Sequence, residues 1–261
     1  MEVSESRPLR LGRRGGYTAL LLEATMLLGA YFAYALTKNI VHASPADFAF
    51  QNAWNLSALE NSLGIFHEAT VQRWFLDHAS WAVYLSSWFY VLGYWPVIGP
   101  AALLLWWKDH SVYLRLRTAA FIAFGLVLLI YAAYPVAPPR MLPGFADTLL
   151  ALPVGESSQG FMSNVYAAMP SVHYGLAVFV AIGMVRVGSP RVKVAGITYQ
   201  ALMFLSVIIT GNHFFLDVAG SLAVVGVSLL AAQVLDRFTA RSVGIAGSPA
   251  DSVPCQIAVG S

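Results

Sequence analysis

The sequence predicts an all-α fold: a polytopic membrane protein with a six-transmembrane-helix bundle and interfacial helices between spans 1 and 2. The first observation behind this prediction is the scarcity of charge, because only 11% of the 261 residues are charged while 58% are hydrophobic. A soluble domain carries about 25% charged residues, which it needs to cover its surface in water. The composition, with a mean hydropathy of +0.65, therefore excludes a water-soluble globular protein.

Six long apolar runs are the second observation. A helix needs about 20 predominantly apolar residues to cross a bilayer. The second run is the longest and contains Gly93, Pro96, Gly99 and Pro100, so we expect one tilted or kinked helix there. The six predicted spans are residues 17–37, 80–107, 118–134, 170–187, 194–210 and 213–235.

The third observation is the uneven distribution of cations. With the N-terminus in the cytoplasm, 12 of the 15 Lys and Arg residues fall on the cytoplasmic side, and only Lys38, Arg73 and Arg140 lie outside. Cytoplasmic connections carry the excess of Lys and Arg in membrane proteins. We therefore predict an integral, multi-pass protein of the cell membrane with both termini in the cytoplasm.

The chain divides into three predicted regions. Residues 1–16 form a basic cytoplasmic N-terminus, residues 17–236 form the six-span membrane domain, and residues 237–261 form a disordered cytoplasmic tail. The first apolar run is also compatible with a signal peptide cleaved near Ala33-Tyr34-Ala35. Because the hydrophobic region of a signal peptide is only about 7 to 15 residues long, an uncleaved anchor is favoured.

Two of the predicted outer connections are long. Residues 39–79 mix polar residues with aromatic and leucine side chains, an amphipathic pattern typical of short helices at the membrane interface. Residues 135–169 are rich in Pro and Gly. A loop of that length without a helix of its own is usually functional or disordered.

Three short motifs lie at the predicted outer boundary of the membrane, and each is weak evidence on its own. Together they place a cation, two imidazoles and a carboxylate at one depth, where ionisable groups are costly enough to indicate a function. The motifs are Pro135-Val-Ala-Pro-Pro-Arg140, Met169-Pro-Ser-Val-His173 and Gly211-Asn-His-Phe-Phe-Leu-Asp217.

The spacing of the third motif favours an activated histidine. His213 and Asp217 lie one helical turn apart, so they share a helix face. The carboxylate can accept a hydrogen bond from Nδ1 of the imidazole, which fixes the tautomer and leaves a lone pair on Nε2. We therefore predict that His213 is a nucleophile.

The other two motifs are suited to binding phosphate. Pro170 fits the first position of a helix, whose free N–H groups, with the Ser171 hydroxyl, would bind an anion. Arg140 offers a planar pair of donors to the same anion, and His173 can exchange a proton with the leaving and the attacking oxygen. This chemistry is a two-step phosphoryl or phosphodiester transfer through a phosphohistidine.

These motifs resemble the type 2 phosphatidic acid phosphatase superfamily, whose pattern is K-x6-R-P, then P-S-G-H, then S-R-x5-H-x3-D. The resemblance covers all three motifs in order and most of the chain from about Asn52 to Leu235. It is nearest to the branch related to inositol phosphorylceramide synthases, in which Pro-Pro-Arg replaces the first motif. The resemblance implies a six-helix membrane bundle that needs no metal.

The resemblance also implies a role for each residue of the site. His213 would be the nucleophile, Asp217 its partner, His173 the acid and base, and Arg140 a phosphate ligand. We expect the remaining phosphate-binding groups to come from the helix end and from the turn before the nucleophile, namely Ser171 and Gly211.

Two cations of the broad family pattern are missing. Ala133 stands where the family has Lys, and Val207 stands where it has Arg. We therefore expect one of the two other outer cations, Lys38 or Arg73, to complete the phosphate site. A site poor in cations favours a singly charged phosphodiester over a doubly charged monoester.

The leading hypothesis is an enzyme that cleaves a phosphoester of a membrane lipid on the extracytoplasmic face. With water as acceptor it is a lipid phosphatase, and with an inositol-like or lipid alcohol it is a phosphotransferase; the sequence leaves both open. In a transferase, the loop at residues 135–169 would act as a lid that excludes water. We expect a lipid phosphate substrate, an alcohol acceptor in the transferase, no cofactor and no nucleic-acid partner, and we assign no oligomeric state.

The alternative is a non-catalytic membrane transporter or channel with a polar cluster at its outer face. It ranks lower, because a pathway needs polar groups through the membrane midplane and the last three predicted spans are apolar there. Glu23 in the first span is the exception, and we expect it to bond a neighbouring helix or to reach the inner interface. A third alternative is a membrane scaffold in which the same residues only cap helices.

Overall fold

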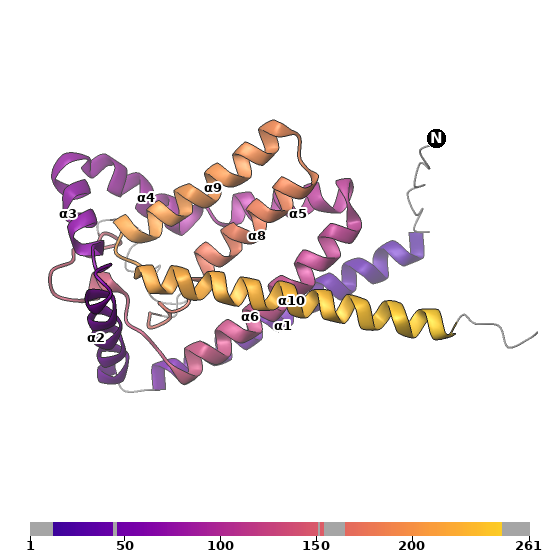
Figure 1. Cartoon of the computed structure of the whole chain (residues 1–261), viewed down its shortest axis with the longest axis horizontal. Helices are drawn as coiled ribbons and strands as arrows, with labels where there is room; N and C mark the ends of the chain where they lie inside the picture. The colour runs from indigo at the N-terminus through magenta and orange to yellow at the C-terminus, as the bar shows by residue number, and fades with distance from the viewer. Residues whose placement is uncertain (1–12, 44–45, 151, 154–164, 247–261) are drawn as a thin grey trace, which may run out of the picture.

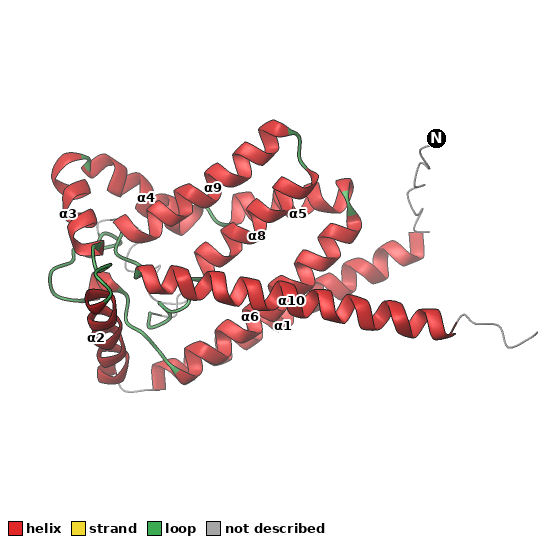
Figure 2. Ribbon diagram, in the orientation of Figure 1, coloured by secondary structure: helices red, strands yellow, loops and turns green. Residues whose placement is uncertain are grey.

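The computed structural model describes residues 13–150, 152–153 and 165–246, except residues 44–45 (Figure 1). The described residues form nine α-helices, one 3-10 helix and no strand, which agrees with the predicted all-α fold (Figure 2). The α-helices are α1 (Arg13–Ala43), α2 (Ala46–Ser62), α3 (Glu68–His78), α4 (Ser80–Leu92), α5 (Trp95–Lys108), α6 (His110–Ala133), α8 (Val172–Val187), α9 (Pro190–Ile209) and α10 (Phe215–Ala246).

A helix or helix pair lies at each of the six predicted spans. Three of these helices, α6, α9 and α10, are long and apolar enough to cross a membrane, and the consecutive pair α4 and α5, bent by 53°, would make a fourth. The apolar stretches of α1 (Leu21–Thr37) and α8 are shorter. The apolar helices support an integral membrane protein, while the count of six spans stays a prediction.

Local sequence sets several helix boundaries. Asp109 starts α6 by accepting hydrogen bonds from Ser111 N and Val112 N at 3.0 Å. Pro135 follows the end of α6, as expected because a proline disfavours helical geometry in the residue before it. The last helix, α10, continues to Ala246, so residues 237–246 of the predicted disordered tail are helical. Residues 1–12 and 247–261 of the predicted terminal regions lie outside the described residues.

The two ends of the bundle differ in character. In Figure 1, the start of α1 and the end of α10 lie together at one end, and α2 and α3 cover the other. Two ion pairs connect helices near the end that holds the chain termini: Arg117 with Glu23 of α1, and Arg115 with Asp236 of α10 at 2.9 Å. The expectation that Glu23 bonds a neighbouring helix is therefore confirmed.

The region between the first two predicted spans contains two short helices, α2 and α3. Several of their large apolar side chains are exposed, and Trp54, Leu59 and Trp74 are about half exposed. Three of their polar side chains, Glu60, Glu68 and Gln72, are buried. These helices therefore expose large apolar side chains to their surroundings and direct two carboxyl groups and an amide toward the interior of the protein.

A candidate active site at the end of the bundle

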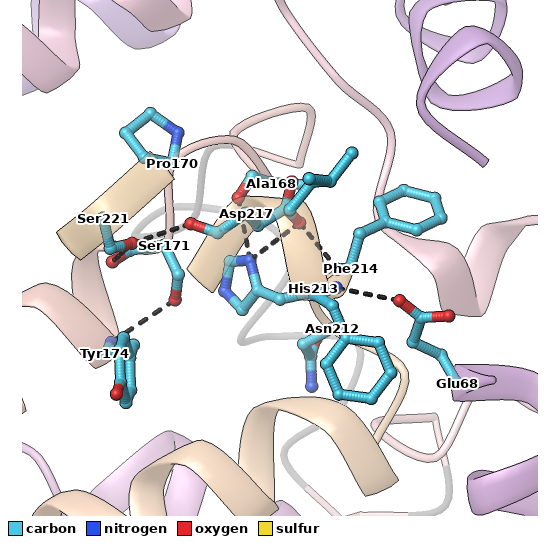
Figure 3. Close-up of polar contacts among 12 residues, drawn as sticks. Glu68, Ala168, Pro170, Ser171, Tyr174, Asn212, His213, Phe214, Asp217 and Ser221 are labelled. Carbon is cyan, nitrogen blue, oxygen red and sulfur yellow. Dashed lines mark hydrogen bonds and ion pairs between the residues drawn. The ribbon is translucent and has the colours of Figure 1, made fainter. Parts of the chain in front are cut away.

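The three motifs lie together at the end of the bundle that α2 and α3 cover. Arg140 lies in the short 3-10 helix Pro139–Met141 that follows α6. His173 lies in the first turn of α8, His213 in the turn between α9 and α10, and Asp217 in the first turn of α10. Figure 3 shows the contacts around His213 and Asp217.

A glycine turn presents His213. Gly211 has φ +67, a conformation that side-chain-bearing residues rarely adopt, and a Cβ atom there would lie 2.8 Å from Nε2 of Gln72. The amides of Asn212 and His213 both donate to the carbonyl of Val207, at 3.1 and 3.2 Å. These bonds end α9 and direct the His213 side chain into the interior, where it is 3% exposed.

The environment of the His213 ring distinguishes its two nitrogens. Nδ1 lies 2.8 Å from the carbonyl oxygen of Ala168 and 3.3 Å from Oδ2 of Asp217 (Figure 3). Because a carbonyl oxygen can only accept, Nδ1 carries the hydrogen. Nε2 is buried and has no hydrogen-bond partner among the described residues. The neutral ring therefore holds its lone pair on Nε2.

Asp217 joins the His213 turn to the start of α8. Its Oδ2 atom accepts a hydrogen bond from the amide of Phe214 at 2.8 Å, and its backbone carbonyl accepts from the amide of Ser171 at 3.2 Å. The Ser221 hydroxyl is within 2.9 Å of the carbonyls of both Ser171 and Asp217. The carboxylate thus orients the turn as well as the imidazole.

A second imidazole lies close to the first. The ring centroids of His173 and His213 are 6.5 Å apart, so one phosphoryl group can contact both rings. Tyr90 of α4 stacks on His173 with centroids 4.2 Å apart, and Tyr94 lies 5.2 Å from it. The sequence did not identify these tyrosines, because aromatic residues in an apolar helix are far more often packing residues than site residues.

Arg140 is held next to the His213 turn by its backbone and its side chain. Its amide donates to the carbonyl of Gly211 at 2.7 Å, and its Nε donates to Oδ1 of Asn212 at 3.0 Å. Its Nη1 donates to Oδ2 of Asp147 at 2.6 Å. The Arg140 guanidinium is therefore buried, rigid and already paired with one carboxylate.

Of the other predicted phosphate-binding residues, Ser171 lies at the site, whereas neither Arg73 nor Lys38 is seen there in the described part of the structure. Ser171 is the N-cap of α8, and its hydroxyl oxygen accepts from the amide of Tyr174 at 3.3 Å. Arg73 lies exposed on α3. The side chain of Lys38, within α1, lies outside the described part of the structure. The structure thus brings Arg140, Ser171, His173, Gly211, His213 and Asp217 together and leaves the second cation a prediction.

Four other polar residues of the site were not identified from the sequence, namely Glu60, Glu68, Gln72 and Asp147. Gln72 binds the amide and the carbonyl of Ala146, at 2.8 and 3.0 Å, and so holds the loop that carries Asp147. Glu60 and Glu68 contact the start of α10. The sequence carried no signal that separates these two glutamates from the exposed Asp47 and Asp77 of the same helices.

An apolar helical bundle with two imidazoles, a carboxylate and an arginine buried at one end defines a membrane protein with a site suited to a phosphoryl group. Residues 54–231 match the PAP2 superfamily, and the chain belongs to this family. Membership suggests an enzyme of the phosphatase type, with phosphatase or phosphotransferase activity. No curated protein and no solved structure matches the chain.

Proposed function

We propose that the protein is a metal-independent membrane enzyme that cleaves a lipid phosphoester through a phosphohistidine intermediate. The state of His213 carries this proposal. Its Nδ1 hydrogen is directed to Ala168 and Asp217, and its Nε2 lone pair is buried without a partner among the described residues. A fixed tautomer with a free lone pair is what a nucleophilic histidine requires.

The proposed reaction has two steps. Nε2 of His213 attacks phosphorus, the bond between phosphorus and the ester oxygen breaks, and protonated His173 gives its proton to the departing alcohol. Neutral His173 then takes a proton from the acceptor hydroxyl, whose oxygen attacks phosphorus while the bond to His213 breaks. Arg140, the Ser171 hydroxyl and the amides at the start of α8 bind the phosphate oxygens during both steps.

The site faces the extracytoplasmic side in this proposal, and the chain crosses the membrane six times. The positions of basic residues support this orientation. Lys108 lies in the last turn of α5, and Arg186 lies in the last turn of α8. Figure 1 places these two helix ends away from α2 and α3, toward the end that holds both chain termini. Cytoplasmic ends carry the Lys and Arg excess, so the opposite end is extracytoplasmic.

The substrate in this proposal is a singly charged phosphodiester, as in the inositol phosphorylceramide synthase-related branch. The pairing of Arg140 with Asp147 supports this choice, because the arginine is partly neutralised before any substrate binds. Lys38 or Arg73 supplies the second cation. With water as acceptor the enzyme hydrolyses the lipid phosphoester, and with a lipid or inositol-like alcohol as acceptor it is a phosphotransferase.

The test uses the purified full chain and two phosphate-labelled lipids, phosphatidic acid and phosphatidylinositol, each with and without a diacylglycerol acceptor whose acyl chains differ in length from those of the substrate. Hydrolysis should release labelled phosphate from phosphatidic acid or labelled inositol phosphate from phosphatidylinositol. Transfer should instead give a labelled lipid that carries the acyl chains of the acceptor. His213→Gln should abolish turnover of either lipid, because an amide cannot form the phosphoryl intermediate, while the protein stays folded.

Exposed Asp77→Asn on α3 serves as the control and should behave like the wild type. Undiminished turnover by His213→Gln would exclude His213 as the nucleophile. The transporter and scaffold hypotheses would then be favoured. In the same assay, Lys38→Ala and Arg73→Ala locate the second cation. If both variants keep wild-type turnover and substrate affinity, neither residue binds the phosphate.

A further inference from the structure

Three buried carboxylates surround the start of α10, next to His213. The first amides of a helix have no acceptor within the helix and need one from elsewhere. Here each of three consecutive amides donates to a different carboxylate. The pairs are Phe214 N with Asp217 Oδ2 at 2.8 Å, Phe215 N with Glu68 Oε1 at 2.8 Å, and Leu216 N with Glu60 Oε1 at 2.7 Å.

Two of these carboxylates come from helices that are distant in the sequence. Glu60 lies on α2 and Glu68 begins α3, and both side chains are 0% exposed. Figure 3 shows Glu68 reaching the turn that carries His213. Since the two contacts close on the residues directly after His213, α2 and α3 determine where that turn lies.

The second oxygen of each glutamate has no donor. Oε2 of Glu60 and Oε2 of Glu68 are both buried without a hydrogen-bond partner among the described residues. Two ionised carboxylates in this position would be desolvated and would repel each other. A single proton placed between the two oxygens removes both costs, because it supplies a donor to one and an acceptor to the other.

The protonation of Glu60 agrees with this arrangement. Burial, contact with the Glu68 carboxyl group and the charge of Asp217 raise the pKa of Glu60 from 4.5 to about 9, although the amide of Leu216 acts against the shift. The direction of this shift means that a proton is retained at these two carboxyl groups at neutral pH.

We propose that Glu60 and Glu68 share one proton between their Oε2 atoms and, as a pair, act as positioning residues for His213. Neither contacts the reacting atoms. Each uses its Oε1 atom to fix one amide after His213, and the shared proton lets both groups remain buried there. The positioning role rests on the proposed function of His213, whereas the shared proton does not.

Glutamine substitutions test the shared proton directly. A glutamine at either position imitates a protonated carboxyl group, because its oxygen accepts from the backbone amide and its NH2 group donates to the remaining glutamate. Glutamine at both positions places two NH2 groups against each other, with no acceptor between them. We therefore expect Glu60→Gln and Glu68→Gln to keep kcat within about threefold of the wild type, and the double variant to lose about tenfold or more.

Two readouts separate positioning from general damage. Turnover of phosphate-labelled phosphatidylinositol, a phosphodiester of the proposed substrate class, should show the loss in kcat with little change in KM, because the lipid contacts other residues. Hydrogen exchange of a peptide that contains Phe215 and Leu216 should accelerate in the double variant and stay slow in both single variants. Asp47→Asn/Asp77→Asn is the matched control, since it removes two exposed carboxylates from the same two helices.

The outcomes are distinguishable. A double variant no worse than the weaker single variant, or a single variant as damaged as the double, overturns the shared proton. If the double variant does not fold while both single variants do, the shared proton is supported. Two independent acceptors would instead give additive losses of stability. If His213→Gln remains active, the proposed function fails, and the exchange rates of the glutamine variants still decide whether the proton is shared.

Discussion

At the scale of single residues, the pairing of Arg140 with Asp147 controls the charge of the site. The two groups are 2.6 Å apart, and the Arg140 side chain is only 6% exposed. Asp147 is also anchored, because its Oδ1 atom accepts from the amide of Leu149 at 3.1 Å. An incoming phosphate must therefore share the guanidinium with a carboxylate that does not move away, which lowers the attraction for a doubly charged ligand.

Asp147→Asn should strengthen the binding of orthovanadate, an analogue of the phosphoryl group. Removing one negative charge next to Arg140 is expected to lower the inhibition constant about fivefold, which corresponds to about 1 kcal/mol for a partly screened charge pair. The measurement is inhibition of lipid turnover by orthovanadate, with Asp77→Asn as the control. Unchanged or weaker inhibition in Asp147→Asn would show that Arg140 does not bind the anion.

Sequence reasoning at this scale was effective where a motif is local. The spacing of His213 and Asp217 predicted their contact, because four residues make one helical turn, but His213 lies in the turn before α10 and not on the helix. The contact of His213 Nδ1 with the carbonyl oxygen of Ala168 could not be predicted from the sequence. The two residues are 45 positions apart, and a backbone carbonyl has no sequence signature.

At the scale of elements, α2 and α3 cover one end of the bundle and direct the buried side chains of Glu60 and Glu68 inward. The sequence predicted short amphipathic helices here without fixing their number, and the structure contains two. Amphipathic composition does not reveal which face meets the protein interior, however, because that depends on whether the surroundings are water or lipid. The carboxylates of Glu68 and Glu60 bind the start of α10, 147 and 156 residues further along the chain.

The inward-facing carboxyl groups predict a pH dependence of stability. Glu60 has a pKa of about 9 in the folded protein and an ordinary value of 4.5 when unfolded, so the folded state binds more protons between these values. Its stabilising contribution is full below pH 4.5 and is lost as the pH rises through this window, by up to about 1.4 kcal/mol per pH unit. The charged groups facing it are Glu68 of α3 and Asp217 of α10.

The measurement is the thermal unfolding midpoint of the purified protein in detergent between pH 5 and pH 9. We expect it to fall with rising pH in the wild type and to fall less steeply in Glu60→Gln, which cannot lose the proton. Asp47→Asn, an exposed substitution on the same helix, should keep the wild-type slope. Equal slopes in the wild type and Glu60→Gln would mean that another group causes the dependence.

At the scale of the whole molecule, the two ends of the bundle differ in the exposure of their arginine side chains. The end near the chain termini holds the ion pairs of Arg115 and Arg117, both exposed or partly exposed at the start of α6. The other end holds Arg140, which is buried and committed to the site. In the proposed orientation, the arginines at the first end would lie near cytoplasmic lipid headgroups, and Arg140 at the second end would bind the substrate.

Labelling of introduced cysteines tests this orientation. In a Cys255→Ser background, Asp77→Cys on α3 should react with a membrane-impermeant maleimide in intact cells. Thr239→Cys on α10 should react only after permeabilisation, because the two exposed positions lie on opposite ends of the bundle. The reverse pattern would place the site in the cytoplasm.

The sequence by itself determined the helical membrane class and the residues of the three motifs, and it led to the superfamily that residues 54–231 match. These properties depend on composition, on the length of apolar runs and on spacings within one turn, all of which are local. Only the tertiary structure decided that Glu60 and Glu68 hold the start of α10, that Asp147 pairs with Arg140 and that Ala168 shares the hydrogen of His213. Those partners are chosen by burial, because a polar group removed from solvent must find a partner wherever the folded chain brings one.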